Sequence, residues 1–332
     1  MKIAILDDHQ DRVRHLRCFE LLAGHEVRIF NHVARGIGQL AIRLASFDAL
    51  VLIRERTSLP AALLKKLPNL KLIAQTGKVA GHIDVDAATA LGILIVEGTG
   101  DPVAPAELTW ALIMAASRRL PDYALNLREG LWQTVSITPE RNMLGRALKG
   151  QTLAIWGYGK IGRIVAGYGK AFGMDVLVWG REQSRAVASQ DGYRIAASKA
   201  EFFEQADVLS LHLRLNEATR CCVGADDLAR MKPASLLVNT SRAELIAADA
   251  LEQALQAGRP GFAALDVFET EPLPASAALL RMHNVLATPH LGYVEEHSYE
   301  LYFAAAFRNI LDVAAGTPHN VLNPSAIGMV RC

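Results

Sequence analysis

The alternation of short apolar runs with segments of helical spacing constrains the fold of this chain more than any other feature. In the first third, five runs are rich in Val, Ile and Leu on both faces, as strands buried in a parallel sheet are. They are Ile3–Leu6, Val27–Phe30, Ala49–Ile53, Leu70–Ala74 and Ile93–Val96. Segments between them, such as Leu59–Leu67, have helix-like spacing. This order predicts βαβ units, in which helices cover both faces of a parallel sheet.

The alternation stops at one long apolar segment and then starts again. Pro105–Leu120 predicts a helix that connects two domains, with Pro105 and Glu107 near its start. Six more strands are predicted after a polar stretch: Leu153–Trp156, Val176–Trp179, Val208–Leu213, Leu236–Asn239, Ala263–Val267 and Val285–Thr288. Six strands with intervening helices complete a doubly wound dinucleotide-binding sheet. A last long helix is expected over Glu295–Ala315.

Length, composition and charge narrow the class of protein. A chain of 332 residues suits two domains, and 51% hydrophobic with 21% charged residues suits a globular protein with sizeable cores. The formal net charge of +1 and the lack of a polybasic or acidic tail predict no nucleic-acid partner. Asp7 and Asp8 interrupt the first apolar run, and no uncharged run is long enough to span a bilayer. We therefore expect a soluble, cytoplasmic protein with no membrane partner.

The cysteines carry little structural information. Cys18, Cys221, Cys222 and Cys332 form neither a disulfide framework nor a zinc-binding spacing. We therefore expect reduced thiols and no metal site.

A glycine-rich segment follows the first strand of the second series. Gly157-Tyr158-Gly159-Lys160-Ile161-Gly162 has the G-x-G-x-x-G pattern and opens a predicted helix, so these six residues are candidate cofactor contacts. The first glycine permits a tight turn, the second lets a pyrophosphate approach the backbone, and the third lets helix and strand pack closely. The helix N-terminus would supply N–H donors to the phosphates. The alternative, an ordinary glycine-rich turn, does not explain the strand series around it.

The end of the next strand bears on the choice between NAD and NADP. An acidic residue there would bind the ribose 2′-hydroxyl of NAD. This position holds Gly180, followed by Arg181, with Arg185 close by. The missing carboxylate relieves repulsion of a 2′-phosphate, and guanidinium groups bind phosphate, so the sequence favours NADP. In the alternative, Arg181 stacks on adenine and Glu182 binds the ribose.

Polar residues follow three later strands, at what should be one edge of the sheet. Reduction of a 2-keto acid needs a cation that fixes the carboxylate and polarises the ketone, and Arg242 has a permanently charged fork of donors. It also needs a proton donor near neutral pH, for which His290 is suited. Glu271 beside the imidazole would orient it and raise its pKa. Thr240 and Asp266 are predicted to contact the nicotinamide end of the cofactor.

Together these segments resemble the D-isomer-specific 2-hydroxyacid dehydrogenases. The resemblance rests on Gly157–Gly162, Asn239–Arg242, Leu265–Pro272 and Thr288–Gly292, and it covers essentially the whole chain. It implies a Rossmann cofactor domain over residues 101–295 and a discontinuous, flavodoxin-like substrate domain over residues 1–100 and 296–332. It also implies that Arg242, Glu271 and His290 are catalytic and that the enzyme is a homodimer. Family formate dehydrogenases have glutamine in place of Glu271, which argues against that activity.

The resemblance also predicts substrate contacts in the first domain. Thr76–Asp84 matches the family loop that binds the substrate carboxylate, and within it Lys78 and Val79 are the expected contacts. Lys78 replaces a small or apolar residue, so it either extends the anion site or points to water. Selectivity for the substrate side chain is expected in loops near Glu97 and Trp132, to which the sequence assigns no definite role.

Two features disagree about the substrate. Arg54 lies in a segment similar to the substrate-domain arginine of phosphoglycerate dehydrogenases and would bind a second anionic group, unless it pairs with Glu55. Gly180 and Arg181 instead resemble NADPH-preferring glyoxylate/hydroxypyruvate reductases. We expect an NAD(P)-dependent oxidoreductase that acts on the CH–OH group of D-2-hydroxy acids. The alternative is a dinucleotide-sensing, corepressor-like interaction protein, although the sequence shows no disordered, partner-recruiting tail.

Overall fold

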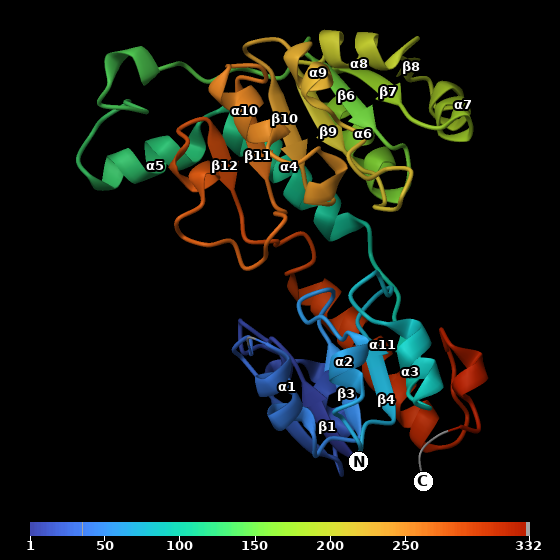
Figure 1. The fold of residues 1–332 in the computed structure, drawn as a ribbon. Helices are drawn as coiled ribbons and strands as arrows, with labels where there is room; N and C mark the ends of the chain where they lie inside the picture. Colours follow the sequence, from blue (N-terminus) through green and yellow to red (C-terminus); the bar gives the residue numbers. More distant parts are fainter. Residues whose placement is uncertain (35, 330–332) are drawn as a thin grey trace. The chain divides into compact units, whose positions relative to one another are not determined.

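Two compact units make up the computed structural model, which describes residues 1–34 and 36–329. Unit 1 combines Met1–Asp101 with the segment that begins at Glu295, and unit 2 is Pro102–Val294. Each unit is built on one parallel sheet flanked by helices (Figure 1). The expected fold class, two doubly wound parallel-sheet domains, is therefore confirmed.

The sheet of unit 1 has five parallel strands in the order β2-β1-β3-β4-β5. The strands are β1 (Lys2–Ile5), β2 (Glu26–Ile29), β3 (Ala49–Leu52), β4 (Leu72–Gln75) and β5 (Leu94–Glu97). This order is that of flavodoxin-like sheets. Every residue of β3 and β4 is buried, which explains why these segments are continuous apolar runs without alternation.

The C-terminal helix belongs to unit 1. The helices of this unit are α1 (Ile37–Leu44), α2 (Ala61–Leu64), α3 (Val85–Ala90) and α11 (Glu296–Ala314), with the 3-10 turns η1 (Val13–His15), η2 (Arg17–Leu22) and η6 (Pro324–Ala326). Helix α11 begins where the Glu295 carboxylate accepts hydrogen bonds from the amides of His297 and Ser298. It buries Phe303 and Phe307 and packs on η2, β4 and β5.

The sheet of unit 2 has seven parallel strands in the order β12-β11-β10-β9-β6-β7-β8. The strands are β6 (Thr152–Trp156), β7 (Asp175–Trp179), β8 (Arg194–Ile195), β9 (Val208–Leu211), β10 (Leu236–Asn239), β11 (Phe262–Leu265) and β12 (Val285–Ala287). Counted from β6, the first six follow the Rossmann order 3-2-1-4-5-6. The expectation of six strands missed β8, a two-residue edge strand that pairs with Leu177 and Val178.

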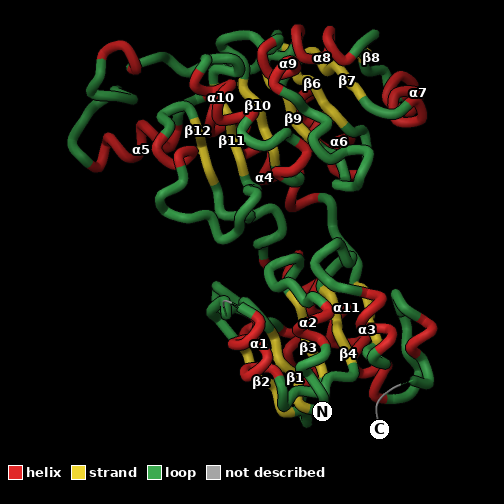
Figure 2. Tube along the Cα trace, viewed as in Figure 1, coloured by secondary structure: helices red, strands yellow, loops and turns green. Residues whose placement is uncertain are grey.

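Helices cover both faces of this second sheet, as the colouring of Figure 2 shows. They are α4 (Val103–Ser117), α5 (Leu120–Arg128), α6 (Lys160–Ala171), α7 (Glu182–Gln190), α8 (Lys199–Gln205), α9 (Ala225–Ala229) and α10 (Ala250–Gln256), with η3 (Pro139–Arg141), η4 (Ala243–Leu245) and η5 (Ala278–Arg281). Helix α4 starts two residues before Pro105 and packs on α6, β10 and β11. Helix α5 lies partly in the polar stretch, for which the sequence predicts no helix.

For membrane spans and thiols, the structure gives information only on residues 1–34 and 36–329. In that part of the chain, no helix is both long enough and apolar enough to cross a membrane. Cys18, Cys221 and Cys222 are free thiols there, and Cys332 lies outside the described residues.

Candidate active site

The glycine turn after β6 is shaped by backbone that fills the space beside two of its glycines. Gly157 has a φ of +101°, and a Cβ there would lie 2.4 Å from the His212 carbonyl oxygen. A Cβ on Gly162 would lie 2.1 Å from the Gly157 carbonyl oxygen. Gly159 differs, because a Cβ there would meet no atom within 4 Å. The turn is therefore closed toward the protein and open at Gly159.

Helix α6 begins directly after this opening. Gly159 is its N-cap, no side chain caps it, and its first turn has no acidic residue, so its N-terminal N–H groups suit an anionic ligand. The Tyr158 side chain is buried and its hydroxyl donates to Asp191 at 2.7 Å, so only the Tyr158 backbone can face a ligand at the turn. Lys160 is exposed, whereas Ile161 packs against the core. These features fit a dinucleotide pyrophosphate.

The arginines after β7 differ in their surroundings. Arg181 is exposed and is the N-cap of α7. Arg185 stands one turn along this helix, with its guanidinium carbon 5.0 Å from the centre of the Trp179 ring. Gly180 leaves no carboxylate beside them, and a Cβ at this position would be 3.8 Å from Ser184 Cβ. Arg181 is therefore the more available cation for a phosphate at this strand end.

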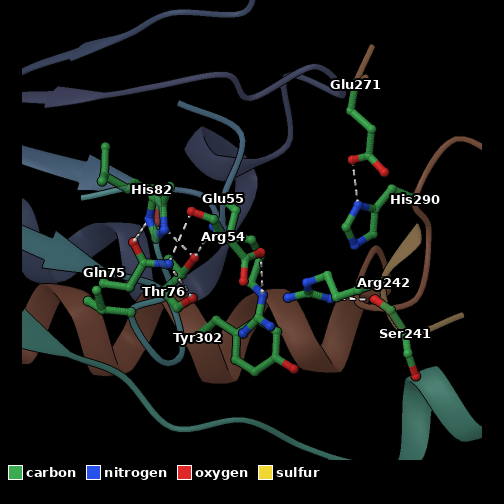
Figure 3. Close-up of polar contacts among 12 residues, drawn as sticks. Arg54, Glu55, Gln75, Thr76, His82, Ser241, Arg242, Glu271, His290 and Tyr302 are labelled. Atoms are coloured by element: carbon green, nitrogen blue, oxygen red, sulfur yellow. Dashed lines mark hydrogen bonds and ion pairs between the residues drawn. The ribbon is translucent and has the colours of Figure 1, made fainter. Parts of the chain in front are cut away.

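The turn after β10 is braced by Asn239. Its side-chain amide donates to the Arg242 carbonyl at 2.9 Å, and its oxygen accepts from the Ser241 amide at 3.0 Å. The Ser241 hydroxyl donates to the Leu211 carbonyl at 2.7 Å, which ties the turn to β9. The Arg242 guanidinium donates to the Ser241 carbonyl through Nη1 at 2.6 Å (Figure 3). These contacts fix the base of the Arg242 side chain.

Thr240 is connected to helix α4. The Thr109 hydroxyl donates to the Pro105 carbonyl at 2.7 Å, so the 2.7 Å contact between Thr109 Oγ1 and Thr240 Oγ1 uses the Thr240 hydrogen. Thr240 can then only accept further hydrogen bonds through its hydroxyl. An acceptor at this strand end suits an amide N–H₂ group such as that of a carboxamide.

Glu271 and His290 form a hydrogen-bonded pair, as Figure 3 shows. The carboxylate Oε2 lies 2.7 Å from His290 Nδ1, and Oε1 accepts from the Phe268 amide at 2.9 Å. A carboxylate can only accept, so Nδ1 carries the proton and Nε2 is left as the atom that can exchange one. His290 has a φ of +54°, a costly backbone conformation that often accompanies a functional position.

The surroundings of Glu271 favour its charged form. Burial raises the pKa of Glu271, but the hydrogen bond and charge of His290, the Phe268 amide and the charge of Arg242 outweigh burial and lower it below its usual value. The Glu271 carboxylate is therefore ionised at neutral pH.

Asp266 holds the loop that carries His290. Its carboxylate is fully buried and accepts from the Thr288 hydroxyl at 2.7 Å, the Leu291 amide at 2.7 Å and the Gly292 amide at 2.9 Å. Burial raises the pKa of Asp266, and the hydrogen bonds that it accepts offset this only in part. Both carboxylate oxygens therefore accept hydrogen bonds within the protein, and the residues that donate them lie before and after His290 in the sequence.

In unit 1, Arg54 lies at the carboxyl edge of the sheet. Its amide donates to Thr76 Oγ1 at 3.0 Å and its carbonyl accepts from Gln75 Nε2 at 3.1 Å, which fixes a backbone with a φ of +53° (Figure 3). Its Nε lies 3.9 Å from Glu55 Oε2, so the ion pair considered from the sequence is present. The guanidinium carbon is also 6.0 Å from the centre of the Tyr302 ring.

Lys78 and Val79 converge on one carboxylate of the same unit. Val79 N donates to Glu97 Oε1 at 2.6 Å, and Lys78 Nζ donates to Glu97 Oε2 at 2.9 Å. Sequence reasoning did not foresee this contact, nor the bracing by Asn239 and Gln75. Strand-end position is the signal that could have found all three, because each of these residues ends a parallel strand. Trp132, by contrast, is 75% exposed in unit 2.

Comparison with known proteins shows which family this chain resembles in sequence. Residues 110–292 match the family described as D-isomer specific 2-hydroxyacid dehydrogenase, NAD binding domain. The chain is 37% identical over 270 residues to a glyoxylate reductase of Aeropyrum pernix, covering 80% of each protein. It is 34% identical over 287 residues to a D-3-phosphoglycerate dehydrogenase of Methanocaldococcus jannaschii, covering 86% of this chain and 53% of that protein. The chain thus spans about half the length of that dehydrogenase.

A solved structure is similar over nearly the whole chain. An oxidoreductase from Ralstonia solanacearum is 56% identical, with a TM-score of 0.96 and coverage of 99% of both chains. The similarity therefore includes both units and is not confined to the glycine turn.

Proposed function

The chain belongs to the D-isomer-specific 2-hydroxyacid dehydrogenase family, and from this premise we propose that it reduces a 2-keto acid to the D-2-hydroxy acid with Arg242, Glu271 and His290 as its catalytic residues. Membership makes it a nicotinamide-dependent oxidoreductase that acts on hydroxy acids. The observation that carries the finer proposal is the 2.7 Å contact between Glu271 Oε2 and His290 Nδ1. This contact leaves one imidazole nitrogen for proton exchange beside an ionised carboxylate.

Each catalytic residue has one task in this proposal. The Arg242 guanidinium binds the substrate carboxylate and polarises the carbonyl, because its fork of donors matches two oxygens. A bound nicotinamide cofactor would supply the hydride to the carbonyl carbon. His290 Nε2 gives its proton to the carbonyl oxygen as charge develops there. Glu271 keeps the imidazole oriented and protonated, and Asp266 and Thr288 hold the loop on which it stands.

For the cofactor, we propose NADPH in preference to NADH. The turn Gly157–Gly162 and the uncapped start of α6 suit the pyrophosphate of either dinucleotide. The exposed Arg181, with Arg185 close by and no acid at Gly180, suits the extra phosphate of NADP. Thr240 suits the carboxamide as a hydrogen-bond acceptor. Asp266 would contribute to that end of the cofactor through the loop that it holds, because its oxygens already accept three hydrogen bonds. Direct titration with both cofactors tests the preference, which tighter NADH binding would contradict.

Unit 1 is proposed as the substrate-binding domain and unit 2 as the cofactor domain. Lys78 and Val79 already bind a carboxylate, that of Glu97, which supports an anion-binding role for them. Arg54 is a weaker candidate, because its side chain lies beside Glu55. The relatives named glyoxylate reductase and D-3-phosphoglycerate dehydrogenase act on acids with one and two anionic groups, so the substrate proposed here is a small 2-keto acid of either kind.

We also propose a homodimer. Six side chains in one segment of unit 2 are large, apolar and exposed: Leu125 at 61%, Leu127 at 56%, Trp132 at 75%, Ile137 at 81%, Met143 at 44% and Leu144 at 88%. This segment, green in Figure 1, extends from the body of its unit. Large exposed apolar side chains that gather in one segment are typical of a protein interface. Sedimentation at micromolar concentration should give twice the monomer mass, and a Trp132→Asp, Ile137→Asp double variant should give a monomer.

A panel of substrates tests the reaction itself. Loss of NADPH or NADH absorbance would be followed with glyoxylate, hydroxypyruvate, pyruvate, phenylpyruvate and 3-phosphohydroxypyruvate. Turnover with any member would support the proposal and rank the cofactors. Tight cofactor binding without turnover on any of them would contradict the proposed substrates and favour the dinucleotide-sensing alternative, which the names of the matched relatives do not favour.

A further inference from the structure

An anion site in unit 1 is occupied by a side chain of the same chain. The Glu97 carboxylate accepts from the Val79 amide at 2.6 Å and from the Lys78 ammonium at 2.9 Å. An amide and an ammonium that converge on two oxygens of one carboxylate are also the donors that would bind a small carboxylic acid. The geometry points to Glu97 as a specificity-determining residue that competes with the substrate carboxylate for these donors. This inference rests on the proposed function.

The backbone around Glu97 is held on both sides, so only its side-chain torsions can release the carboxylate. Its amide donates to Asn320 O at 3.0 Å, and its carbonyl accepts from Asn309 Nδ2 at 2.9 Å. The next amide, that of Gly98, donates to Gly77 O at 2.8 Å. A Cβ on Gly98 would lie 2.7 Å from Gly77 N, so the two loops touch backbone to backbone. A displaced Glu97 carboxylate therefore stays near the donors that it has left.

The two donors contribute unequally to the hold on Glu97. The Lys78 side chain is 65% exposed, whereas that of Glu97 is 14% exposed. An ion pair with so exposed an ammonium is weak and is screened by salt. The hydrogen bond from the Val79 amide to an ionised carboxylate is the stronger contact. A substrate carboxylate must break this bond, and it then has the charge of Glu97 beside it.

Competition of this kind sets which acids are bound. An incoming anion pays both for the lost Val79 bond and for repulsion by the displaced carboxylate, and the repulsion grows with the charge of the anion. Glu97 therefore weakens the binding of every acid and weakens that of a dianion most. A different role for Glu97, as a brace that keeps the Lys78–Val79 loop in shape, predicts the opposite effect of removing it.

The test compares wild-type enzyme with Glu97→Ala and Glu97→Gln, using glyoxylate and 3-phosphohydroxypyruvate at saturating cofactor. We expect Glu97→Ala to lower KM for glyoxylate about tenfold, the loss of one charge-assisted hydrogen bond, and KM for the dianion by a larger factor. The kcat values should stay within about twofold, because Glu97 takes no part in the proposed proton transfer. Glu97→Gln keeps the size of the side chain and should give a smaller decrease of KM.

Asp86→Asn is the matched control, because Asp86 is an exposed acid in the same unit and the variant removes the same charge. Asp86→Asn should leave KM unchanged, and an equal decrease in this variant would overturn the local competition. A KM that stays constant or rises in both Glu97 variants, with wild-type thermal stability, would also overturn it, and a rise would support the brace. Absence of turnover by the wild-type enzyme would count against the proposed function itself. Turnover with unaltered KM in the variants would count only against the role of Glu97.

Titration with oxamate, an unreactive analogue of a 2-keto acid, gives a second measurement that needs no turnover. Its dissociation constant should fall about tenfold in Glu97→Ala. An unchanged or larger constant would contradict the competition.

Discussion

The glycine turn after β6 and the loop after β12 end strands of the same sheet, but they are specified in opposite ways. In the turn, backbone carbonyls occupy the space where side chains at Gly157 and Gly162 would be. In the loop, His290 is held by side chains from elsewhere in the chain, namely Glu271 directly and Asp266 through the two amides that follow His290. The turn requires that Gly157 and Gly162 have no side chain, whereas the loop requires the side chains of Glu271 and Asp266.

This difference decides how each region fails. Added atoms in the turn collide with the fold or with the cofactor, so their effect should be on stability or on cofactor affinity. Removed atoms in the loop leave the fold intact but leave the proton donor absent or misaligned, so their effect should be on turnover and its pH dependence. The predictions below separate the two regions by these observables.

The largest expected effect is that of His290→Ala. It should lower kcat for keto-acid reduction by about 10²–10⁴, the range usual for a general acid–base group. The cofactor dissociation constant should change less than about twofold, because the glycine turn is untouched. Steady-state kinetics and a fluorescence titration measure the two quantities. A kcat within about threefold of wild type would rule out His290 as the proton donor.

Gly159→Ala and Gly162→Ala test the turn within one motif. The added Cβ at 159 meets no protein atom within 4 Å, so this variant should keep wild-type stability and bind the cofactor about tenfold more weakly. The Cβ at 162 would lie 2.1 Å from a carbonyl oxygen, so this variant should lose about 1–3 kcal/mol of unfolding free energy. Thermal unfolding and cofactor titration check both. Equal loss of stability in the two variants would contradict the different roles of Gly159 and Gly162.

Arg181→Ala should change the choice of cofactor. Loss of a charge-assisted contact to the 2′-phosphate should weaken NADPH binding about tenfold and leave NADH binding nearly constant. Arg185→Ala is the matched control, because its guanidinium is already placed against the Trp179 ring, and it should have the smaller effect. The ratio of the two dissociation constants is the measurement. An unchanged ratio in Arg181→Ala would remove this residue from the phosphate site.

Glu271→Gln should act on the pH profile more than on the rate at low pH. The pKa of Glu271 is lowered by its hydrogen bond with His290 despite burial, so the carboxylate is charged at neutral pH. The uncharged amide of the variant no longer attracts the proton that His290 gives to the substrate. The alkaline decline of kcat for reduction should therefore move to lower pH. An unchanged midpoint would show that Glu271 does not stabilise the proton donor.

The sequence was informative where structure follows from local pattern. Buried parallel strands such as β3 and β4 are continuous apolar runs, and the glycine turn is a motif in one stretch of chain. Strand β8 could not be predicted in this way, because two residues, Arg194 and Ile195, are too few to show a pattern. Helix α5 was missed because none of its residues is buried, which leaves no apolar stripe to recognise.

In the candidate site too, some features follow from the local sequence and others do not. The residue types of Arg242, Glu271 and His290, together with their positions after strands, were enough to predict that they share one edge of a sheet. Other contacts in the two units could not be predicted. The bracing of Arg242 by Asn239 and the contact of Glu97 with Val79 depend on side-chain positions that periodicity does not encode. Domain limits, the homodimer, the preference for NADP and a cytoplasmic location stay predictions.

The helix that covers β4 and β5 is also the last long element of unit 1 to be synthesised. When β1–β5 leave the ribosome, the apolar face that will receive Phe303 and Phe307 has no cover until residues 102–294 have been made, about 10–40 s later at ordinary rates of translation. Unit 2 is continuous and has no such delay. Nascent chains should therefore present an open first unit while the second is being made, and this interval is when binding by a chaperone would protect the chain from aggregation.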